Sequence, residues 1–352
     1  MVAVLQELSR SFSSLNVLIV GKTPSWFWCQ NLPDNCDYEI YNAVIDVGLV
    51  QTNPFSHNLD LTLNRLKDFL NFPHNPYSKL LDKVQNQNPH FVLCDISPMG
   101  IKVASELNKP SVLLENFTWD WIYEPFLRTN IKFKNIILSI KQIYTQSSLH
   151  IQCTPFSKNC NSSTKVNPIF RQGEKTREKV LSQLGLNQTD QYTLVTTGGI
   201  SMHHTFSNLD KDLFLVVPGN FEQVFKQKQR IYIPMNSHIY FPDIVRHANC
   251  IVGKAGYGTV SECWGMNIPF LGVFREEFRE SEILKKFCRK NLIFEEIKLS
   301  EFLNGTWDNL SIQLASKKLG TKSTERISGA VEVSEKIINL LFKKKNNHVS
   351  SW

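Results

Sequence analysis

The sequence predicts an α/β protein with two Rossmann-like, doubly wound domains that face a cleft. Its 352 residues exceed one typical domain and suit two of about 150 residues each. Short runs rich in Val, Ile and Leu alternate with amphipathic stretches of helical length, the pattern of parallel strands joined by helices. A polar stretch between Cys153 and Gly173 separates two such series. Ligands are expected where the carboxyl ends of both sets of strands meet.

The first half is predicted to form one doubly wound sheet. Apolar runs typical of buried strands alternate with segments whose apolar residues recur at helical spacing. The expected strands are 16–20, 39–46, 91–95, 111–115 and 150–153, and the expected helices are near 59–70, 77–86, 100–107 and 135–144.

The second half repeats the alternation after the polar stretch and closes with an amphipathic helix. The expected helices are 175–184 and 326–342, and the expected strands are 192–197, 214–217, 230–233, 250–253 and 270–273. The predicted domains are therefore residues 1–165 and 166–346, followed by a tail at 347–352.

Composition narrows the class of protein. Hydrophobic residues make up 42% of the chain and charged residues 20%, which is typical of globular proteins and speaks against collagen-like, coiled-coil or disordered classes. The formal net charge of +7 favours anionic partners such as nucleotide phosphates, and a solvated basic surface explains it equally well. The lysines at 343–345 are interpreted as a solvated terminus, so no nucleic-acid partner is predicted.

Cysteine spacing and hydropathy bear on the compartment. The eight cysteines contain no C-x-x-C pair, which favours reduced thiols over disulfides and argues against a zinc site. No apolar run reaches the roughly 18 residues of a membrane span, and the first ten residues do not have the pattern of a signal peptide. We expect a cytoplasmic protein, for which the basic charge and terminal helix still allow peripheral membrane contact.

The sharpest motif lies between residues 250 and 274 and has the order strand, tight glycine loop, helix, turn and strand. Gly256 and Gly258 let a ligand approach the backbone closely. Thr259 supplies a hydroxyl. The helix beginning near Tyr257 points unpaired N–H groups at the loop, an arrangement that binds phosphate. The spacing matches neither the G-x-G-x-x-G fingerprint nor the Walker loop.

Two further features accompany this loop, each with an alternative reading. Glu262 lies one helical turn beyond Gly258, where it can accept hydrogen bonds from ribose hydroxyls or simply complement the helix dipole. Gly198 and Gly199 follow the first strand of this half. They can bring backbone N–H groups to the same ligand, although a plain turn is the commoner reading of such a pair.

Candidate catalytic groups in the first half follow predicted strands. Asp46, Asp95 and Asp120 lie at or just after strand ends, and Trp119 accompanies Asp120. An acceptor hydroxyl needs a general base within hydrogen-bond reach, and a carboxylate can serve. For Trp119, packing beneath a loop is the favoured alternative.

The residues of the second half resemble a known fold family. A series of short motifs runs through this half: Pro234, Pro242-Asp243, Gly256-Tyr-Gly-Thr259, Ser261-Glu262 and Ile268-Pro269. The series resembles the donor-binding half of nucleotide-sugar glycosyltransferases with two Rossmann-like domains, the GT-B fold. Segments 46–51, 115–123 and 254–262 are similar to the glycosyltransferase-like N-terminal half of plant-type L-arabinokinase and its bacterial stand-alone relatives. The likeness extends to about Ile297 and is more specific for the fold than for the sugar.

The resemblance implies roles for the motif residues. The donor diphosphate would lie at Gly256, Gly258 and Thr259, with Glu262 on the ribose and the Gly198-Gly199 pair closing over the phosphates. No metal or other cofactor is implied, because in this fold the helix end and basic side chains stabilise the departing diphosphate. Lys254 and Arg275 are the candidate cations, and a surface position is the alternative for each.

The chain also departs from the family pattern. Relatives begin with a strand and a loop of the type G-x-G-H-x-x-R before the helix that corresponds to residues 2–10 here. The first strand and its glycine-rich loop are therefore expected to be missing from the N-terminal domain, and the usual Asp-Gln or His-Gln pair that meets the donor sugar is absent after Phe274.

Three functions follow as hypotheses. The leading one is a glycosyltransferase of the hexosyltransferase type. It would transfer a sugar from a nucleotide-diphosphate donor, with uridine as the expected nucleoside, to a hydroxyl acceptor. The second is a non-catalytic nucleotide-sugar-binding protein that has lost the acceptor loop. The third is a nucleotide-sugar epimerase, which would convert the donor with no acceptor present.

Overall fold

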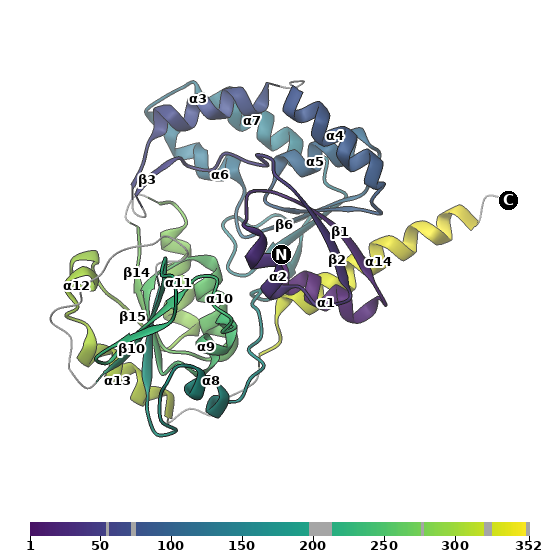
Figure 1. Cartoon of the computed structure of the whole chain (residues 1–352). Helices are drawn as coiled ribbons and strands as arrows, with labels where there is room; N and C mark the ends of the chain where they lie inside the picture. The colour runs from purple at the N-terminus through teal and green to yellow at the C-terminus, as the bar shows by residue number, and fades with distance from the viewer. Residues whose placement is uncertain (54–55, 72–74, 197–212, 276–277, 320–325, 350–352) are drawn as a thin grey trace. The chain divides into compact units, whose positions relative to one another are not determined.

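The chain folds into two compact α/β units (Figure 1). A computed structural model describes residues 1–53, 56–71, 75–196, 213–275, 278–319 and 326–349. One unit comprises Met1–Asn167 together with Gly329–Trp352, and the other comprises Pro168–Ser328. The second unit is thus inserted into the first. Near its two ends, the Phe170 N–H donates to Ser328 Oγ (3.1 Å) and that hydroxyl donates to the Phe170 carbonyl (3.0 Å).

The C-terminal helix corrects the predicted domain assignment. Helix α14, Gly329–Val349, was expected in the second domain, but it belongs to the first unit, where it contacts α1, β7 and β8. The amphipathic pattern predicts the helix itself, but it does not specify which core the apolar face covers.

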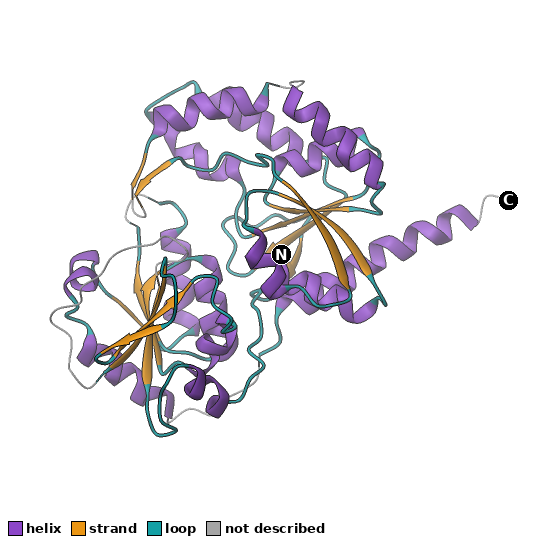
Figure 2. Ribbon diagram, viewed as in Figure 1, coloured by secondary structure: helices purple, strands orange, loops and turns teal. Residues whose placement is uncertain are grey.

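The first unit places helices over short parallel strands. Its core layers can be followed by secondary structure in Figure 2. The elements are α1 (Val2–Ser11), β1 (Leu15–Val20), α2 (Ser25–Asn31), β2 (Cys36–Tyr41), β3 (Gln51–Asn53), β4 (Ser56–His57), α3 (Leu59–Leu70), α4 (Asn75–Gln87), β5 (Val92–Asp95), α5 (Pro98–Glu106), β6 (Ser111–Glu115), α6 (Trp119–Tyr123), a 3-10 turn η1 (Glu124–Arg128), α7 (Phe133–Tyr144), β7 (Leu149–Cys153), β8 (Thr164–Val166) and α14.

The single sheet expected for this half is wrong. Strands β1 and β2 pair only with each other among the described residues, and a separate parallel sheet has the order β5-β6-β7-β8. The expected strand 39–46 ends at Tyr41, and 43–50 form no strand. Apolar periodicity locates buried strands, whereas the pairing between strands depends on contacts distant in sequence.

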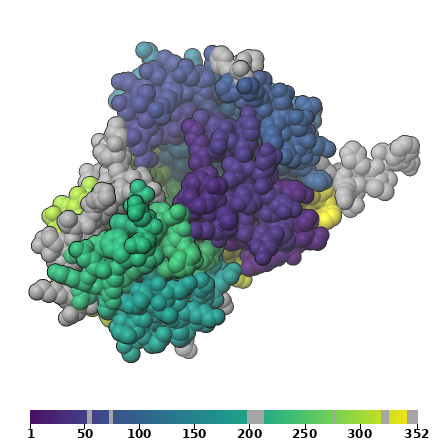
Figure 3. Space-filling view, in the orientation of Figure 1, coloured from purple at the N-terminus to yellow at the C-terminus, as the bar shows by residue number. Residues whose placement is uncertain are grey.

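Helices cover both faces of the β1–β2 pair because alternate side chains of a strand point to opposite faces. Ile19 packs with Val2 of α1 and Trp28 of α2, whereas Leu18 and Val20 pack against α4 and α5. Helices α3, α4, α5 and α7 lie side by side in Figure 1. The purple N-terminal segment that includes α1 lies at the surface of this unit in the space-filling view (Figure 3).

The second unit is a doubly wound sheet with the strand order β11-β12-β10-β9-β13-β14-β15, in which only β11 runs antiparallel to its neighbour. Its elements are α8 (Arg177–Gln183), β9 (Tyr192–Thr196), β10 (Phe214–Gly219), β11 (Phe225–Gln227), β12 (Arg230–Pro234), α9 (Phe241–His247), β13 (Cys250–Lys254), α10 (Tyr257–Met266), β14 (Phe270–Val273), α11 (Ser281–Asn291), β15 (Phe294–Glu296), α12 (Leu299–Asn304) and α13 (Asp308–Leu319).

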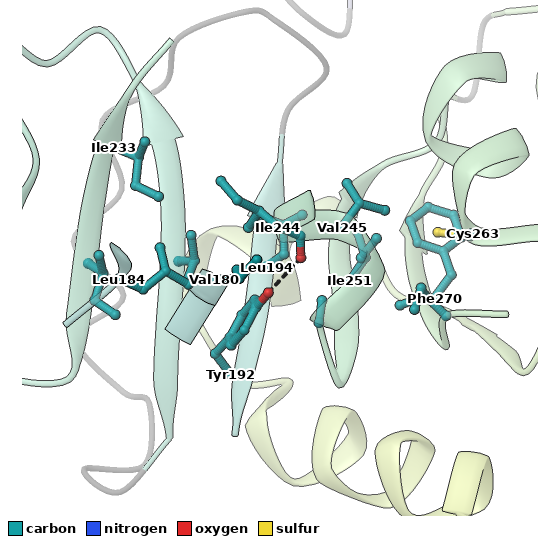
Figure 4. Packing of buried hydrophobic residues seen from close by; sticks show 14 of the residues in the cluster. Val180, Leu184, Tyr192, Leu194, Ile233, Ile244, Val245, Ile251, Cys263 and Phe270 are labelled. Carbon is teal, nitrogen blue, oxygen red and sulfur yellow. Dashed lines mark hydrogen bonds between the residues drawn. The ribbon is translucent and has the colours of Figure 1, made fainter. Parts of the chain in front are cut away.

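The core of the second unit packs β-branched and aromatic side chains between the sheet and its helices (Figure 4). Leu194 and Ile251 lie on neighbouring strands and are fully or almost fully buried. The buried Tyr192 hydroxyl donates to the Ile244 carbonyl at 2.6 Å, so the polar end of this core residue is satisfied. This core fixes the strand ends from which the candidate site is built.

A close contact between β9 and β13 makes Gly253 necessary. A Cβ at Gly253 would overlap the Thr196 carbonyl oxygen, whereas a Cβ at Gly258 would meet no atom of the described residues within 4 Å. We expect Gly253→Ala to lower the free energy of unfolding by about 1–3 kcal/mol and Gly258→Ala to leave it nearly unchanged. Chemical denaturation of the two variants measures the difference, and equal unfolding free energies would contradict this account.

Candidate functional site

The strand order of the second unit locates a ligand site before any side chain is considered. From β9 the chain moves through β10 and β12 in one direction, and from β13 it moves through β14 and β15 in the other. The point of reversal lies between β9 and β13, which pair in parallel. In open α/β sheets, ligands bind beyond the carboxyl ends of the strands at such a point.

The loop after β13 presents an open helix start at this position. Helix α10 begins at Tyr257, as the sequence predicted, and its N-cap residue Gly256 has no side chain to cap the first turn. Among the described residues, no heavy atom lies within 4 Å of the position that a Cβ of Gly256 or Gly258 would occupy. The first N–H groups of a helix have no partner inside the helix, so this terminus suits an anion. Thr259, in the same turn, is partly exposed.

Two cations flank the helix start at the ends of β13 and β14. Lys254 ends β13 and is half-buried. Burial, followed by the nearby charge of Arg275, lowers the pKa of Lys254 to about 8. Both side chains therefore place positive charge near the site, and for Arg275 the alternative of a surface position is wrong because its exposure is only 9%.

Arg275 is held in place yet keeps one nitrogen unsatisfied. Its Nη2 forms an ion pair with Glu280, and its guanidinium carbon lies 3.3 Å from the centroid of the Phe278 ring. Its buried Nη1 has no hydrogen-bond partner in the part of the chain that the structure describes. Leaving a buried charged donor unpaired is costly, so this nitrogen is suited to receive an anionic ligand.

Glu262 is placed as predicted, one turn into α10, but it has a protein partner. Its Oε1 forms a 2.8 Å ion pair with Arg171 Nη2, and both side chains are largely buried. The guanidinium of Arg171 also lies 5.8 Å from the centroid of Phe241. A ribose contact would therefore involve a carboxylate that Arg171 already orients. No local sequence pattern points to this pair, because its members are separated by 91 positions.

The remaining predicted donor residues, Gly198 and Gly199, lie outside the described residues. The strand that leads to them, β9, ends at Thr196 beside Gly253. The predicted donor residues that are described are therefore Lys254, Gly256, Gly258, Thr259, Glu262 and Arg275.

In the first unit, Asp46 is the carboxyl group with the most altered environment among the predicted candidates. The Trp119 indole N–H donates to Asp46 Oδ2 at 3.3 Å. Burial raises the pKa of Asp46 to about 6, the charge of Asp95 adds to this, and the Trp119 hydrogen bond opposes it. A carboxyl group whose pKa lies near 6 is suited to accept a proton close to neutral pH.

Aromatic residues fix the position of Trp119 beside Asp46. The Trp119 ring stacks on Tyr123, with ring centroids 5.8 Å apart, and the Tyr123 hydroxyl donates to the Gly48 carbonyl at 2.8 Å. Gly48 has a φ of +64°, and a Cβ there would lie 3.2 Å from the Trp119 ring. Trp119 therefore packs beneath a loop, as the alternative interpretation predicted, and also contacts Asp46, the candidate base.

The other two candidate carboxylates lie in the same region with different surroundings. Asp95 ends β5 and is exposed. Asp120 lies in the first turn of α6 and is partly buried. Their neighbour Tyr144 has a pKa raised first by burial and then by the charges of Asp120 and Asp46. The Tyr144 hydroxyl, which sequence reasoning missed, donates to the Ile96 carbonyl at 2.8 Å.

Together, the doubly wound second unit and the helix start at its point of reversal define a doubly wound α/β fold with a candidate anion site. The structure is similar to crystal structures of glycosyltransferases. It matches CalG4, the calicheamicin glycosyltransferase, with a TM-score of 0.58 and 12% identity over 98% of this chain and 93% of that chain. It matches Arabidopsis thaliana UGT89C1 complexed with UDP-L-rhamnose with a TM-score of 0.59 and 12% identity over 96% and 94% of the two chains.

A third match is a UDP-glucosyltransferase from Polygonum tinctorium, with a TM-score of 0.59 and 11% identity over 96% of this chain and 94% of that chain. The chain therefore has the GT-B fold, as the sequence predicted. Identities this low establish the fold alone.

Sequence comparison gives one relative to report. L-arabinokinase of Arabidopsis thaliana is 24% identical over 281 residues, which is 76% of this chain and 26% of the arabinokinase. This chain thus spans about a quarter of the length of that relative. It matches no protein-family model. No helix among the described residues is long and apolar enough to cross a membrane.

Proposed function

We propose that this protein is a glycosyltransferase that transfers a sugar from a uridine-diphosphate donor to a hydroxyl acceptor. The observation that carries the proposal is the open start of α10, flanked by Lys254 and by a buried Arg275 with an unsatisfied nitrogen. Crystal structures of the same fold, among them one described as complexed with UDP-L-rhamnose, support a nucleotide-sugar donor.

The proposal assigns a role to residues of each unit. In the second, the α10 N–H groups, Lys254 and Arg275 would bind the diphosphate and stabilise the charge that it gains when the bond to the sugar breaks. In the first unit, Asp46 would accept the proton of the acceptor hydroxyl. The oxygen of that hydroxyl would form the new bond to the sugar. These cations would replace a metal ion, so we propose that no metal cofactor takes part.

The test is calorimetric titration of the purified chain with UDP and several UDP-sugars, with and without EDTA. We expect saturable binding that EDTA does not change. Binding must then be followed by an assay of UDP release from each donor in the presence of a panel of hydroxyl acceptors. Absence of binding by a folded chain would refute the proposal.

Two outcomes of this assay would support the rival functions. Donor binding without turnover with any acceptor would indicate a non-catalytic nucleotide-sugar-binding protein. Conversion of the donor to an epimer without an acceptor would indicate an epimerase. UDP release that requires an acceptor distinguishes the transferase from both.

The pKa of Lys254 predicts how UDP affinity depends on pH. Lys254 is charged below its pKa of about 8 and loses its charge above it, so UDP affinity is expected to fall as the pH rises past about 8. Lys254→Gln should bind UDP about tenfold more weakly at pH 7, the usual effect of losing one charged contact. Lys254→Arg should retain binding above pH 8, because arginine stays charged there. An affinity independent of pH in the unmodified protein would contradict the role of Lys254.

A further inference from the structure

A cluster of polar side chains in the first unit surrounds Cys160, which the proposed transfer reaction does not use. Six of the eight cysteines are buried, and burial raises the pKa of each of these thiols: Cys36, Cys94, Cys153, Cys250, Cys263 and Cys288. Cys29 is exposed and Cys160 is partly exposed. Only these two thiols are accessible to a reagent in the folded chain, and their surroundings differ.

Strand pairing brings a carboxylate and a histidine together on the two strands that precede Cys160. Strands β6 and β7 run parallel, with Glu115 opposite Gln152 and Leu113 opposite His150. His150 and Gln152 are two residues apart and therefore share a face of the sheet with Glu115. His150 Nε2 lies 2.9 Å from Glu115 Oε1, and Cys160 follows in the loop after β7.

Gln152 fixes this loop against the strands. Its Oε1 accepts hydrogen bonds from the Cys160 N–H at 2.9 Å and from Ser163 Oγ at 2.8 Å. Its Nε2 donates to Glu115 Oε1 at 2.7 Å and to the Lys158 carbonyl at 2.8 Å. The backbone at Cys160 is therefore held in one position relative to Glu115, which is a condition for a preorganised site.

The cluster contains a buried carboxyl group with one oxygen that has no hydrogen-bond partner among the described residues. Glu115 is 3% exposed, and its Oε2 has no hydrogen-bond partner within the described ranges. A buried carboxylate is costly unless it is paired. A positively charged imidazole at His150 would offset that cost, and the His150 side chain remains 20% exposed to solvent.

The pKa values of His150 and Cys160 are shifted in opposite directions. Burial lowers the pKa of His150, but the hydrogen bond and charge of Glu115 outweigh it, so the pKa is raised. The pKa of the Cys160 thiol is lowered, first by its hydrogen bond with Ser162 Oγ at 3.2 Å and then by the charge and hydrogen bond of His150. Burial opposes this shift. Ser162 and His150 act on the Cys160 thiol, and Glu115 acts on His150.

We propose that Cys160, with His150 and Glu115, forms a reactive-thiolate site that exchanges with small disulfides. Cys160 gives up its proton, for which His150 is the proposed acceptor, and its sulfur attacks one sulfur of the disulfide. The disulfide bond of the small molecule breaks, a new S–S bond forms to Cys160, and the other half leaves as a thiolate. The cysteine is oxidised and the small disulfide is reduced, so no other reagent is required. A polar network that only supports the loop is the alternative.

The experiment uses the full chain and glutathione disulfide as the probe. Cleavage after Lys158 and Lys165 isolates Cys160 from the other cysteines, so mass spectrometry can follow the mixed disulfide at Cys160 and at Cys29 in one digest. At pH 7 we expect Cys160 to react about three- to tenfold faster than Cys29, because the thiolate is the nucleophile. A rate for Cys160 equal to or below that of Cys29 would overturn the proposal.

Matched variants separate reactivity from loop support. His150→Gln should slow Cys160 to about the rate of Cys29, whereas His90→Gln, at an exposed histidine of the same unit, should leave the rate unchanged. If His150→Gln does not fold, the test is the pH dependence of the reaction rates of Cys160 and Cys29 in the unmodified protein. Cys160 must then reach half its maximal rate at a lower pH than Cys29, and coincident profiles would refute the site.

Discussion

The Gly258→Trp variant is expected to lose UDP binding, with affinity reduced at least about a hundredfold. No heavy atom of the described part of the chain lies within 4 Å of a Cβ built at Gly258, and a phosphate would reach the first N–H groups of α10 there. An indole there would occupy the space that the phosphate needs, and the Cβ that carries it would meet no described heavy atom within 4 Å. Calorimetric titration with UDP measures the loss.

The matched control is Gly258→Ala, whose small side chain adds only a Cβ at this position. We expect it to bind UDP within about threefold of the unmodified chain, and both variants should unfold at similar temperatures. If Gly258→Trp folds and binds UDP normally, the start of α10 is not the donor site and the proposed function loses its main support.

The Asp46→Asn variant is expected to lose transfer activity by about 10²–10⁴-fold, the usual contribution of a general base, while its affinity for UDP remains unchanged. Asparagine keeps the shape and can still accept from Trp119, but it cannot accept the proton of an acceptor hydroxyl. The assay is UDP release with whichever acceptor supports turnover in the unmodified protein.

The pH dependence tests the same residue independently. Asp46 is protonated below its pKa of about 6 and is a carboxylate above it, so kcat/KM should rise with pH through about 6 and then level off. Asp95→Asn and Asp120→Asn are the matched controls, for which we expect losses below about tenfold. A larger loss in either control than in Asp46→Asn would move the base to that residue.

Local patterns in the sequence were sufficient to predict most of the second unit. The apolar runs near Tyr192, Cys250 and Phe270 became adjacent parallel strands, and the glycines at 256 and 258 marked the start of α10. In the first unit the same reasoning placed β1 and β5 in one sheet, which was wrong. Strand existence depends on local apolar periodicity, whereas sheet membership depends on pairings that periodicity does not encode.

The candidate site could be predicted only where its residues are close in sequence. Lys254 through Glu262 belong to one segment, and spacing alone suggested their common position. The ion pair of Glu262 with Arg171, and the contact of Asp46 with Trp119 across 73 positions, became visible only in the fold. Neither partner carries a local pattern that would point to the other.

The insertion of one unit into the other also has an evolutionary consequence. Phe170 and Ser328, near the two ends of the inserted unit, are joined by reciprocal hydrogen bonds, so the chain leaves that unit beside the place where it arrives. Segments with adjacent termini are those that tolerate transplantation and circular permutation. Residues 168–328 thus have the layout of an inserted domain that can be exchanged. A gene could acquire a different domain at this position and keep the first unit, including its C-terminal helix α14.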